Sequence, residues 1–133
     1  MRCVVLLCAV SIPMLVGCGS GVERSSTEKV TGTVSYKNAP LKTGTITFEP
    51  EKGRSAIGEI VDGKIVKVTT YEDDDGAVIG NHKVGITSTE ADPKDSMKST
   101  SRIPTKYATP ANSGLTTTIK KGEPNDLKFD LND

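Results

Sequence analysis

AIGEIVDGKIVKVTT, residues 56–70, is the stretch that decides the fold. Asp62-Gly63 lies between two apolar runs, and a two-residue Asp-Gly turn is a strong sign of a β-hairpin because it tolerates the positive φ that a tight turn needs. The segment therefore predicts a strand over residues 56–61 and a returning strand over 64–70. We expect Val66 and Val68 to share one face of the second strand.

Alternation with a period of two continues on both sides of this hairpin. Val30, Gly32, Val34 and Tyr36 alternate with polar residues, and a second alternating run contains Ile46 and Phe48. Further strands are predicted over 82–88 and 115–120, and over the last apolar run of Leu127, Phe129 and Leu131. Seven short, half-polar strands separated by Gly, Pro and Asn turns are typical of an antiparallel sandwich. The sequence thus predicts an all-β, seven-stranded antiparallel β-sandwich.

Residues 90–112 interrupt the strand pattern. This stretch holds three prolines and no recognisable alternation, so it predicts a long loop. Loops of this length are usually functional or disordered, which makes the stretch a candidate binding surface. Alternatively, residues 103–107 could lie along an edge of the sandwich, where proline blocks edge-to-edge pairing.

The N-terminus has the pattern of a secretory signal peptide. Arg2 precedes an apolar run over residues 3–16 that is shorter than the roughly 20 residues a membrane-spanning helix needs. Residues 15–18, Leu-Val-Gly-Cys, resemble the lipobox of bacterial lipoproteins. The resemblance implies cleavage between Gly17 and Cys18 and lipid attachment to Cys18. The alternative is an ordinary signal peptide, cut elsewhere, in which Cys18 is incidental.

Three segments follow from these signals: a signal peptide over 1–17, a lipidated cysteine and flexible tether over 18–28, and the β-domain over 29–133. Cys3 and Cys8 lie in the signal peptide, so the mature chain would retain a single cysteine and could form no internal disulfide. The membrane is the partner that the lipid anchor implies, on the periplasmic or cell-surface side of a bacterial membrane.

Composition and motifs narrow the chemistry. With 17 basic and 17 acidic residues, the chain lacks the charge excess that nucleic-acid binding requires. His82 is the only histidine, and an enzyme would have to be built on it, although a histidine at a strand end is more often a packing residue. Glu72, Asp73 and Asp75 are candidate calcium ligands, but a solvated turn is the favoured interpretation of this acidic loop. No cofactor is expected.

Several segments together resemble one family. They are Val30-Thr31-Gly32-Thr33-Val34, Gly44–Phe48, Asp62-Gly63-Lys64, Asp75–Ile86, Ile103-Pro104-Thr105-Lys106-Tyr107 and Ser113-Gly114-Leu115. Over roughly residues 29–133 the chain resembles small lipoproteins, abundant in planctomycete-type bacteria, whose domain is similar to the carboxypeptidase regulatory-like, or transthyretin-like, sandwich. The resemblance implies a seven-stranded prealbumin-like fold and no established activity.

We therefore expect a membrane-anchored, extracytoplasmic, non-enzymatic module that serves binding, assembly or structure in the cell envelope. Its partner would be an envelope protein or a glycan, and Lys83, Lys106 and Tyr107 are the candidate contact residues. The alternative is a calcium-dependent or carbohydrate-binding β-sandwich module that uses the acidic loop.

Overall fold

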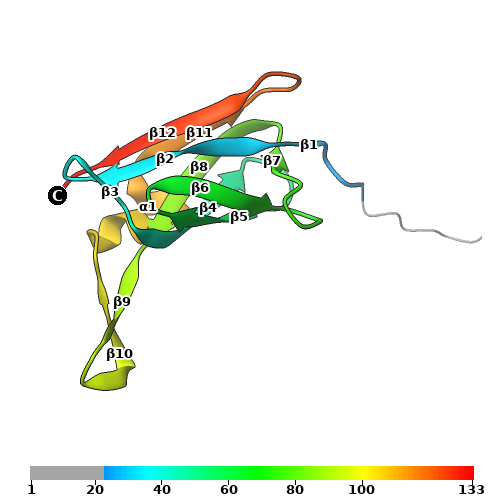
Figure 1. The fold of residues 1–133 in the computed structure, drawn as a ribbon. Helices are drawn as coiled ribbons and strands as arrows, with labels where there is room; N and C mark the ends of the chain where they lie inside the picture. Colours follow the sequence, from blue (N-terminus) through cyan, green and yellow to red (C-terminus); the bar gives the residue numbers. More distant parts are fainter. Residues whose placement is uncertain (1–22) are drawn as a thin grey trace, which may run out of the picture.

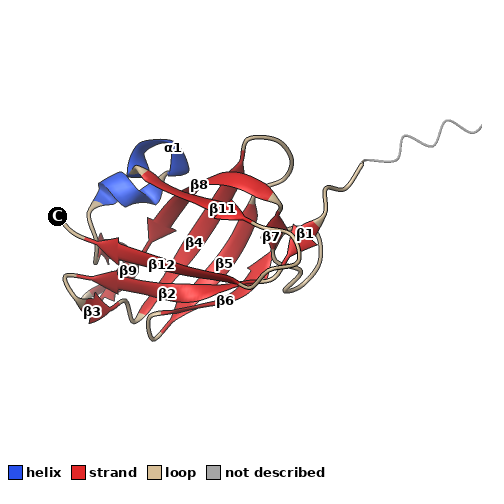
Figure 2. Ribbon diagram, turned by 90° about the horizontal axis from the view of Figure 1, so that it is seen from above, coloured by secondary structure: helices blue, strands red, loops and turns tan. Residues whose placement is uncertain are grey.

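A single curled sheet forms most of the molecule (Figures 1 and 2). The computed structural model describes residues 23–133, so the predicted signal peptide, Gly17 and Cys18 lie outside the described residues. The strands of the sheet follow one another in the order β11 (Leu115–Ile119), β8 (Gly80–Thr87), β4 (Thr43–Pro50), β5 (Ala56–Val61), β6 (Lys64–Thr69), β2 (Val30–Tyr36) and β12 (Asn125–Leu131). An eighth, two-residue strand, β3 (Ala39–Pro40), pairs with β2.

The seven predicted strands correspond one to one with the seven longer strands of this sheet, which confirms the all-β class. Pairing is antiparallel except between β12 and β2, which run in parallel. The prediction of a wholly antiparallel fold was wrong at this pair. The chain turns after β11 and crosses to β2 instead of pairing back on β11, so the last strand enters the sheet beside the first long one.

The core lies inside the curl of the sheet. Alternate residues of each strand point into it, and β2 and β5 show a strict alternation of buried and exposed positions over most of their length. The most completely buried large side chains come from strands throughout the sheet: Val34, Ile46, Phe48, Ile60, Val68, Val84, Ile86, Ile119 and Leu131. Burying an aliphatic or aromatic side chain of this size contributes roughly 1.5–3 kcal/mol, which makes this cluster the main source of stability.

The β5–β6 hairpin forms as predicted, with one correction to its register. Asp62 and Gly63 both adopt positive φ, as a tight two-residue turn requires. On β6, however, Ile65 and Val68 are the buried residues, whereas Val66 is only partly buried. Lys67 adopts a φ of 48° beside an irregularity in the β5–β6 pairing. A bulge inserts one extra residue and so shifts the alternation, which periodicity alone did not reveal.

The tether prediction also needs correction at its end. β1 (Thr27–Glu28) pairs with β7 (Ala77–Val78), so the last two residues assigned to the flexible tether belong to a small second sheet. Gly76, with a φ of 91°, makes this pairing possible. A Cβ on it would lie 1.8 Å from the carbonyl oxygen of Glu28.

Residues 90–112 are structured, contrary to the prediction of a loop without strands. β9 (Thr89–Asp92) and β10 (Asp95–Ser101) form an antiparallel hairpin that projects from the body, followed by a 3-10 helix over Thr105–Ala108 and a short helix α1 (Pro110–Ser113) (Figure 1). We call this hairpin, residues 89–101, the arm. After the arm, Ile103 and Tyr107 return to the core cluster.

Candidate functional site

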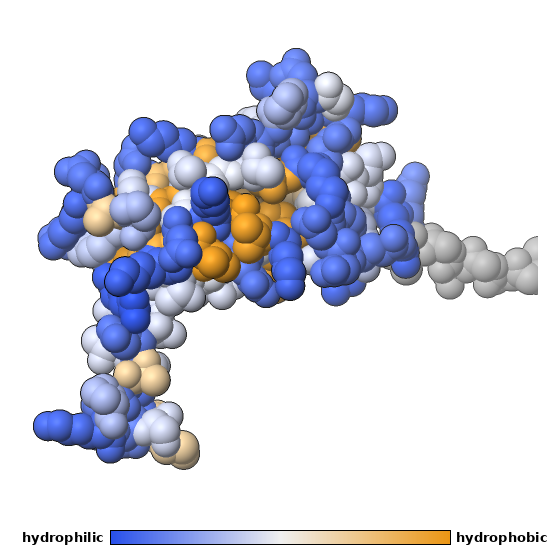
Figure 3. Space-filling model, viewed as in Figure 1, coloured by the Kyte–Doolittle hydropathy of each residue, from blue (hydrophilic) through white to orange (hydrophobic). Residues whose placement is uncertain are grey.

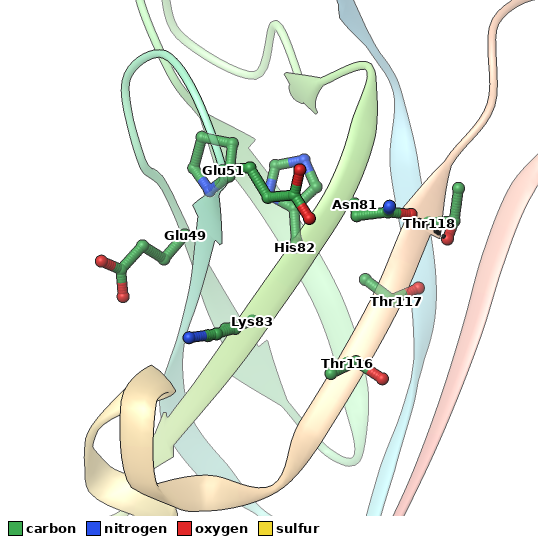
Figure 4. A pocket seen from close by; sticks show the side chains of 9 residues that line it. Glu49, Glu51, Asn81, His82, Lys83, Thr116, Thr117 and Thr118 are labelled. Atoms are coloured by element: carbon green, nitrogen blue, oxygen red, sulfur yellow. Dashed lines mark hydrogen bonds between the residues drawn. The ribbon is translucent and has the colours of Figure 1, made fainter.

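An open polar groove crosses the outward face of three strands of the main sheet (Figure 4). It has a volume of about 760 Å³. Its residues come from the end of β4 and the turn that follows, from the start of β8 and from the middle of β11: Glu49, Pro50, Glu51, Asn81, His82, Lys83, Thr116, Thr117 and Thr118. The groove thus brings together segments that are far apart in the sequence.

Strand register explains why these side chains meet. Lys83 lies opposite Glu49 on one neighbouring strand and opposite Thr116 on the other, so the three side chains share one outward row. In the next row on that face, the Thr118 hydroxyl donates a hydrogen bond of 2.8 Å to the Asn81 side-chain oxygen. The groove therefore offers an ammonium group, carboxylates, an amide and hydroxyls, which suit hydrogen bonding to a small polar ligand.

His82 belongs to the wall of this groove but its ring faces the protein interior. The residue is 2% exposed, and its Nε2 lies 2.6 Å from the Val78 carbonyl oxygen. A carbonyl only accepts, so Nε2 carries the proton in this contact. The ring also meets Phe48 edge-on at 6.2 Å between centroids. Its Nδ1 is buried with no hydrogen-bond partner among the described residues. These contacts describe a packed core histidine.

The acidic loop of residues 72–75 is held by its own backbone. Asp75 Oδ1 accepts a hydrogen bond of 2.6 Å from the Thr70 N–H, while Oδ2 accepts bonds of 3.0 and 3.1 Å from the N–H groups of Tyr71 and Glu72. Desolvation raises the pKa of Asp75, but these donors favour the charged form and the net result is a lowered pKa. Both oxygens of Asp75 are thereby engaged in organising the loop.

The other acidic side chains of this loop point to different surroundings. Glu72 pairs with Arg24 at 3.2 Å, Asp74 pairs with Lys29 at 2.6 Å, and Asp73 is exposed. Within residues 23–133, no group of three acidic, histidine or cysteine side chains is placed to hold a metal ion. The carboxylates Glu72, Asp73 and Asp75 are neighbours in sequence but do not converge.

Lys106 and Tyr107, predicted as contact residues, have different roles in the structure. Tyr107 is 7% exposed, and its hydroxyl donates a hydrogen bond of 2.8 Å to the Asn132 carbonyl while accepting one of 3.2 Å from the Asn132 N–H. It therefore fastens the C-terminal end of the chain to the core instead of presenting its ring to a partner. Lys106 is exposed, with its ammonium 5.0 Å from the centre of the Tyr107 ring.

The arm is the most exposed part of the described chain. Six of the seven residues of β10 and three of the four residues of β9 are exposed. Met97, at 94% exposure, is the extreme case, and it lies where the β9–β10 pairing is irregular. Figure 3 shows the arm as a mainly hydrophilic projection, whereas the body carries an apolar area over β5 and β6, where Ile57 and Val61 are exposed.

Side chains at both ends keep the arm in a hairpin. At its tip, Asp92 accepts a hydrogen bond of 2.8 Å from the Lys94 N–H, which is typical of an Asx-turn. At its base, Arg102 pairs with Glu90 at 3.2 Å. The Asp92-Pro93-Lys94 sequence is the local signal that could have revealed the turn.

Comparisons with known proteins give no relative for this chain: no family model matches it, and neither curated proteins nor solved structures yield a match. Among residues 23–133, none of the helices has the length and apolar character needed to cross a membrane.

Proposed function

We propose that this protein is a lipid-anchored, extracytoplasmic, non-enzymatic binding or assembly module that presents the arm to a partner in the cell envelope. The observation that carries the proposal is the arm itself: a hairpin whose residues are almost all exposed and which carries a 94% exposed methionine, Met97. An isolated two-stranded hairpin is only marginally stable and buries no core of its own. A contact function explains such a projection better than a role in stability does.

The placement of the arm fits an anchored molecule. The described chain begins beside β1, and the arm leaves the body at the opposite end (Figure 1). If lipid on Cys18 holds the N-terminal end at a membrane, the arm is attached to the part of the body that lies farther from that surface. Its seven-residue strand β10 extends roughly 20 Å at about 3.3 Å per residue. That reach would allow contact with a partner that does not touch the body of the domain.

Met97 is the proposed anchor of this contact. Methionine is flexible and polarizable, and it suits surfaces that adapt to a partner. The surrounding charges include Lys94, Asp95 and Lys98, with Lys98 and Asp95 within 3.6 Å of each other. One fully exposed apolar side chain among balanced charges favours a protein partner over an anionic polymer.

We infer that the domain is a prealbumin-like sandwich, because the path of the main sheet contains the seven strands that such a domain has. The two-residue strand β3 and the parallel β2–β12 pair are then local features of this member.

The test places a photo-reactive amino acid at position 97 of the full-length lipoprotein in its own host. A matched variant carries the same group at position 57, an exposed apolar site on the body. We expect one recurrent envelope protein to cross-link at position 97 and not at position 57. Equal labelling of the same proteins from both sites would remove the arm from the proposal.

The anchor is tested separately. Cys18→Ser should block processing and leave an uncleaved precursor in the membrane fraction, because the acyl acceptor is lost. Normal processing of this variant would show that the lipobox interpretation is wrong, while the cross-linking result at position 97 would stand independently.

The groove supports a second candidate function, binding of a glycan or another small polar molecule. Its mixture of hydroxyl, amide and charged groups matches the hydrogen-bonding character of sugars. Cell-wall oligosaccharides can be titrated against the protein and against Lys83→Ala, whose side chain lies in the central row. Binding that weakens in this variant would favour the glycan function, and the absence of binding would leave the arm as the sole candidate surface.

A further inference from the structure

The two edges of the main sheet differ in how they are protected. An edge strand presents unpaired N–H and C=O groups, and natural proteins commonly discourage pairing there with charged side chains, prolines or bulges. β12 follows this rule, since Asp126, Lys128 and Asp130 place a charge at every second position. β11, with the sequence Leu-Thr-Thr-Thr-Ile, has no charge, no proline and no irregularity in its pairing with β8.

The side chains of β11 also show an opening along this edge. Leu115 and Thr117 belong to the inward-facing set of the strand, together with Ile119. Ile119 is 1% exposed, yet Leu115 and Thr117 are only partly buried. Neighbouring elements in the described chain thus leave part of this edge uncovered.

The sequence of β11 is complementary to itself. If two copies pair antiparallel about a two-fold axis at Thr117, Thr117 faces its own counterpart, Thr116 faces Thr118, and Leu115 faces Ile119. Apolar residues then meet on the inward face and hydroxyl residues meet on the outward face. Thr–Thr and aliphatic cross-strand pairs are favourable, and no like charges stand opposite each other within the strand.

We propose that β11 is a self-association edge, through which two copies of this chain form a symmetric dimer with one continuous sheet across the two-fold axis. Isologous two-fold pairing of this kind is the commonest form of protein self-association. A contact centred on one five-residue strand lies at the small end of interface sizes, so the dimer is expected to be weak and dependent on concentration. The contact does not use the arm.

The first experiment tests the register by disulfide formation in the full-length protein. Directly opposite residues of an antiparallel pair have Cβ atoms about 4.5–5.5 Å apart, within the range that a disulfide can bridge after small adjustments. Thr117→Cys should therefore form a covalent dimer under mild oxidation. Thr116→Cys should form no such dimer. Residue 116 faces residue 118 of the other copy, so the two introduced cysteines lie apart along the strand. The unsubstituted chain, run alongside, reports any cross-link through native cysteines.

The second experiment tests the energetics with two matched double variants, assayed by sedimentation of the detergent-solubilised lipoprotein over a concentration series. Thr116→Asp with Thr118→Asp places like charges opposite each other twice, and we expect dimerisation to weaken by about tenfold. Thr116→Lys with Thr118→Asp has the same number of charges in complementary pairs and should retain the dimer. Both variants lose the same Thr118–Asn81 hydrogen bond, so its loss cancels in the comparison.

Three results would overturn the proposal. One is a wild-type protein that stays monomeric into the high micromolar range. Another is a covalent dimer from Lys128→Cys and none from Thr117→Cys, which would assign self-association to the β12 edge. The third is equal dimerisation of the two double variants, which would show that β11 does not pair with itself.

Discussion

Asp75→Ala is the substitution that separates a structural acidic loop from a ligand site most clearly. It removes the acceptor for three backbone N–H groups at once. Thr70 is 3% exposed, so its N–H would lose its partner in a buried position, at a cost of about 1–3 kcal/mol. Tyr71 and Glu72 lie closer to solvent, and water can replace much of what their amides lose.

The expected loss of unfolding free energy is therefore about 2–3 kcal/mol. For a domain of this size that corresponds to a drop in melting temperature of roughly 10 °C. Thermal unfolding followed by circular dichroism measures the shift. Asp73→Ala is the matched control, because Asp73 is an exposed neighbour of the same charge, and its substitution should change stability by less than about 0.5 kcal/mol.

The effect of Asp75 should also depend on pH. Because the folded state holds the pKa of this carboxyl below its ordinary value, its stabilising contribution is fully present above the pKa of the unfolded chain. The contribution is lost as pH falls through the lower, folded-state pKa. The stability gap between wild type and Asp75→Ala should thus be constant near neutral pH and shrink below about pH 4. Equal melting temperatures for the Asp75 and Asp73 variants would refute this account of the loop.

Five further substitutions, in three tests, probe the packing and its hydrogen bonds. Gly76→Ala should lower the free energy of unfolding by at least about 3 kcal/mol, because the new Cβ would overlap the Glu28 carbonyl of β1. Gly122→Ala is the control: the space around it is open, so only its positive φ should matter, at a cost of about 1 kcal/mol. Chemical denaturation of the two variants measures the difference. Tyr107→Phe should lower the free energy of unfolding by about 1 kcal/mol, because the hydrogen bonds of the hydroxyl to the Asn132 backbone are lost. The loss should appear as a lower denaturation midpoint with an unchanged slope, and an unchanged midpoint would mean that these hydrogen bonds contribute nothing. Val68→Ala should lower the free energy of unfolding by about 2 kcal/mol, and Val66→Ala by much less, because Val68 is buried and Val66 only partly so. A larger loss for Val66→Ala than for Val68→Ala would show that the bulge of β6 lies elsewhere.

The long strands could be predicted from the sequence because each carries an apolar face that the curl of the sheet buries. β6 shows where this reasoning stops, since the positive φ of Lys67 shifts the alternation without any glycine to mark it. The arm was missed for a related reason: its strands bury nothing, so no apolar period exists to recognise. The packing role that is more usual for a histidine at a strand end agrees with the burial of His82 in the structure.

The groove could not have been predicted in the same way. Lys83 was selected from the sequence, but its neighbours Glu49 and Thr116 come from strands that meet it only through pairing over long distances. Tyr107 is predicted as a contact residue because it lies in the long stretch of residues 90–112. Its burial depends on the 3-10 helix that returns the chain to the core after the arm, and no local pattern indicates that return.

The parallel pairing of β12 with β2 bears on how the chain acquires its structure. Paired residues such as Val30 and Asn125 are 95 positions apart, so one of the longest ladders of the sheet cannot form until the final segment has been synthesised. Contacts of such high sequence separation slow folding. A product lacking residues 125–133 would leave β2 without its parallel partner and with an unpaired side. Truncation at this terminus should therefore be far less tolerated than truncation at most chain ends.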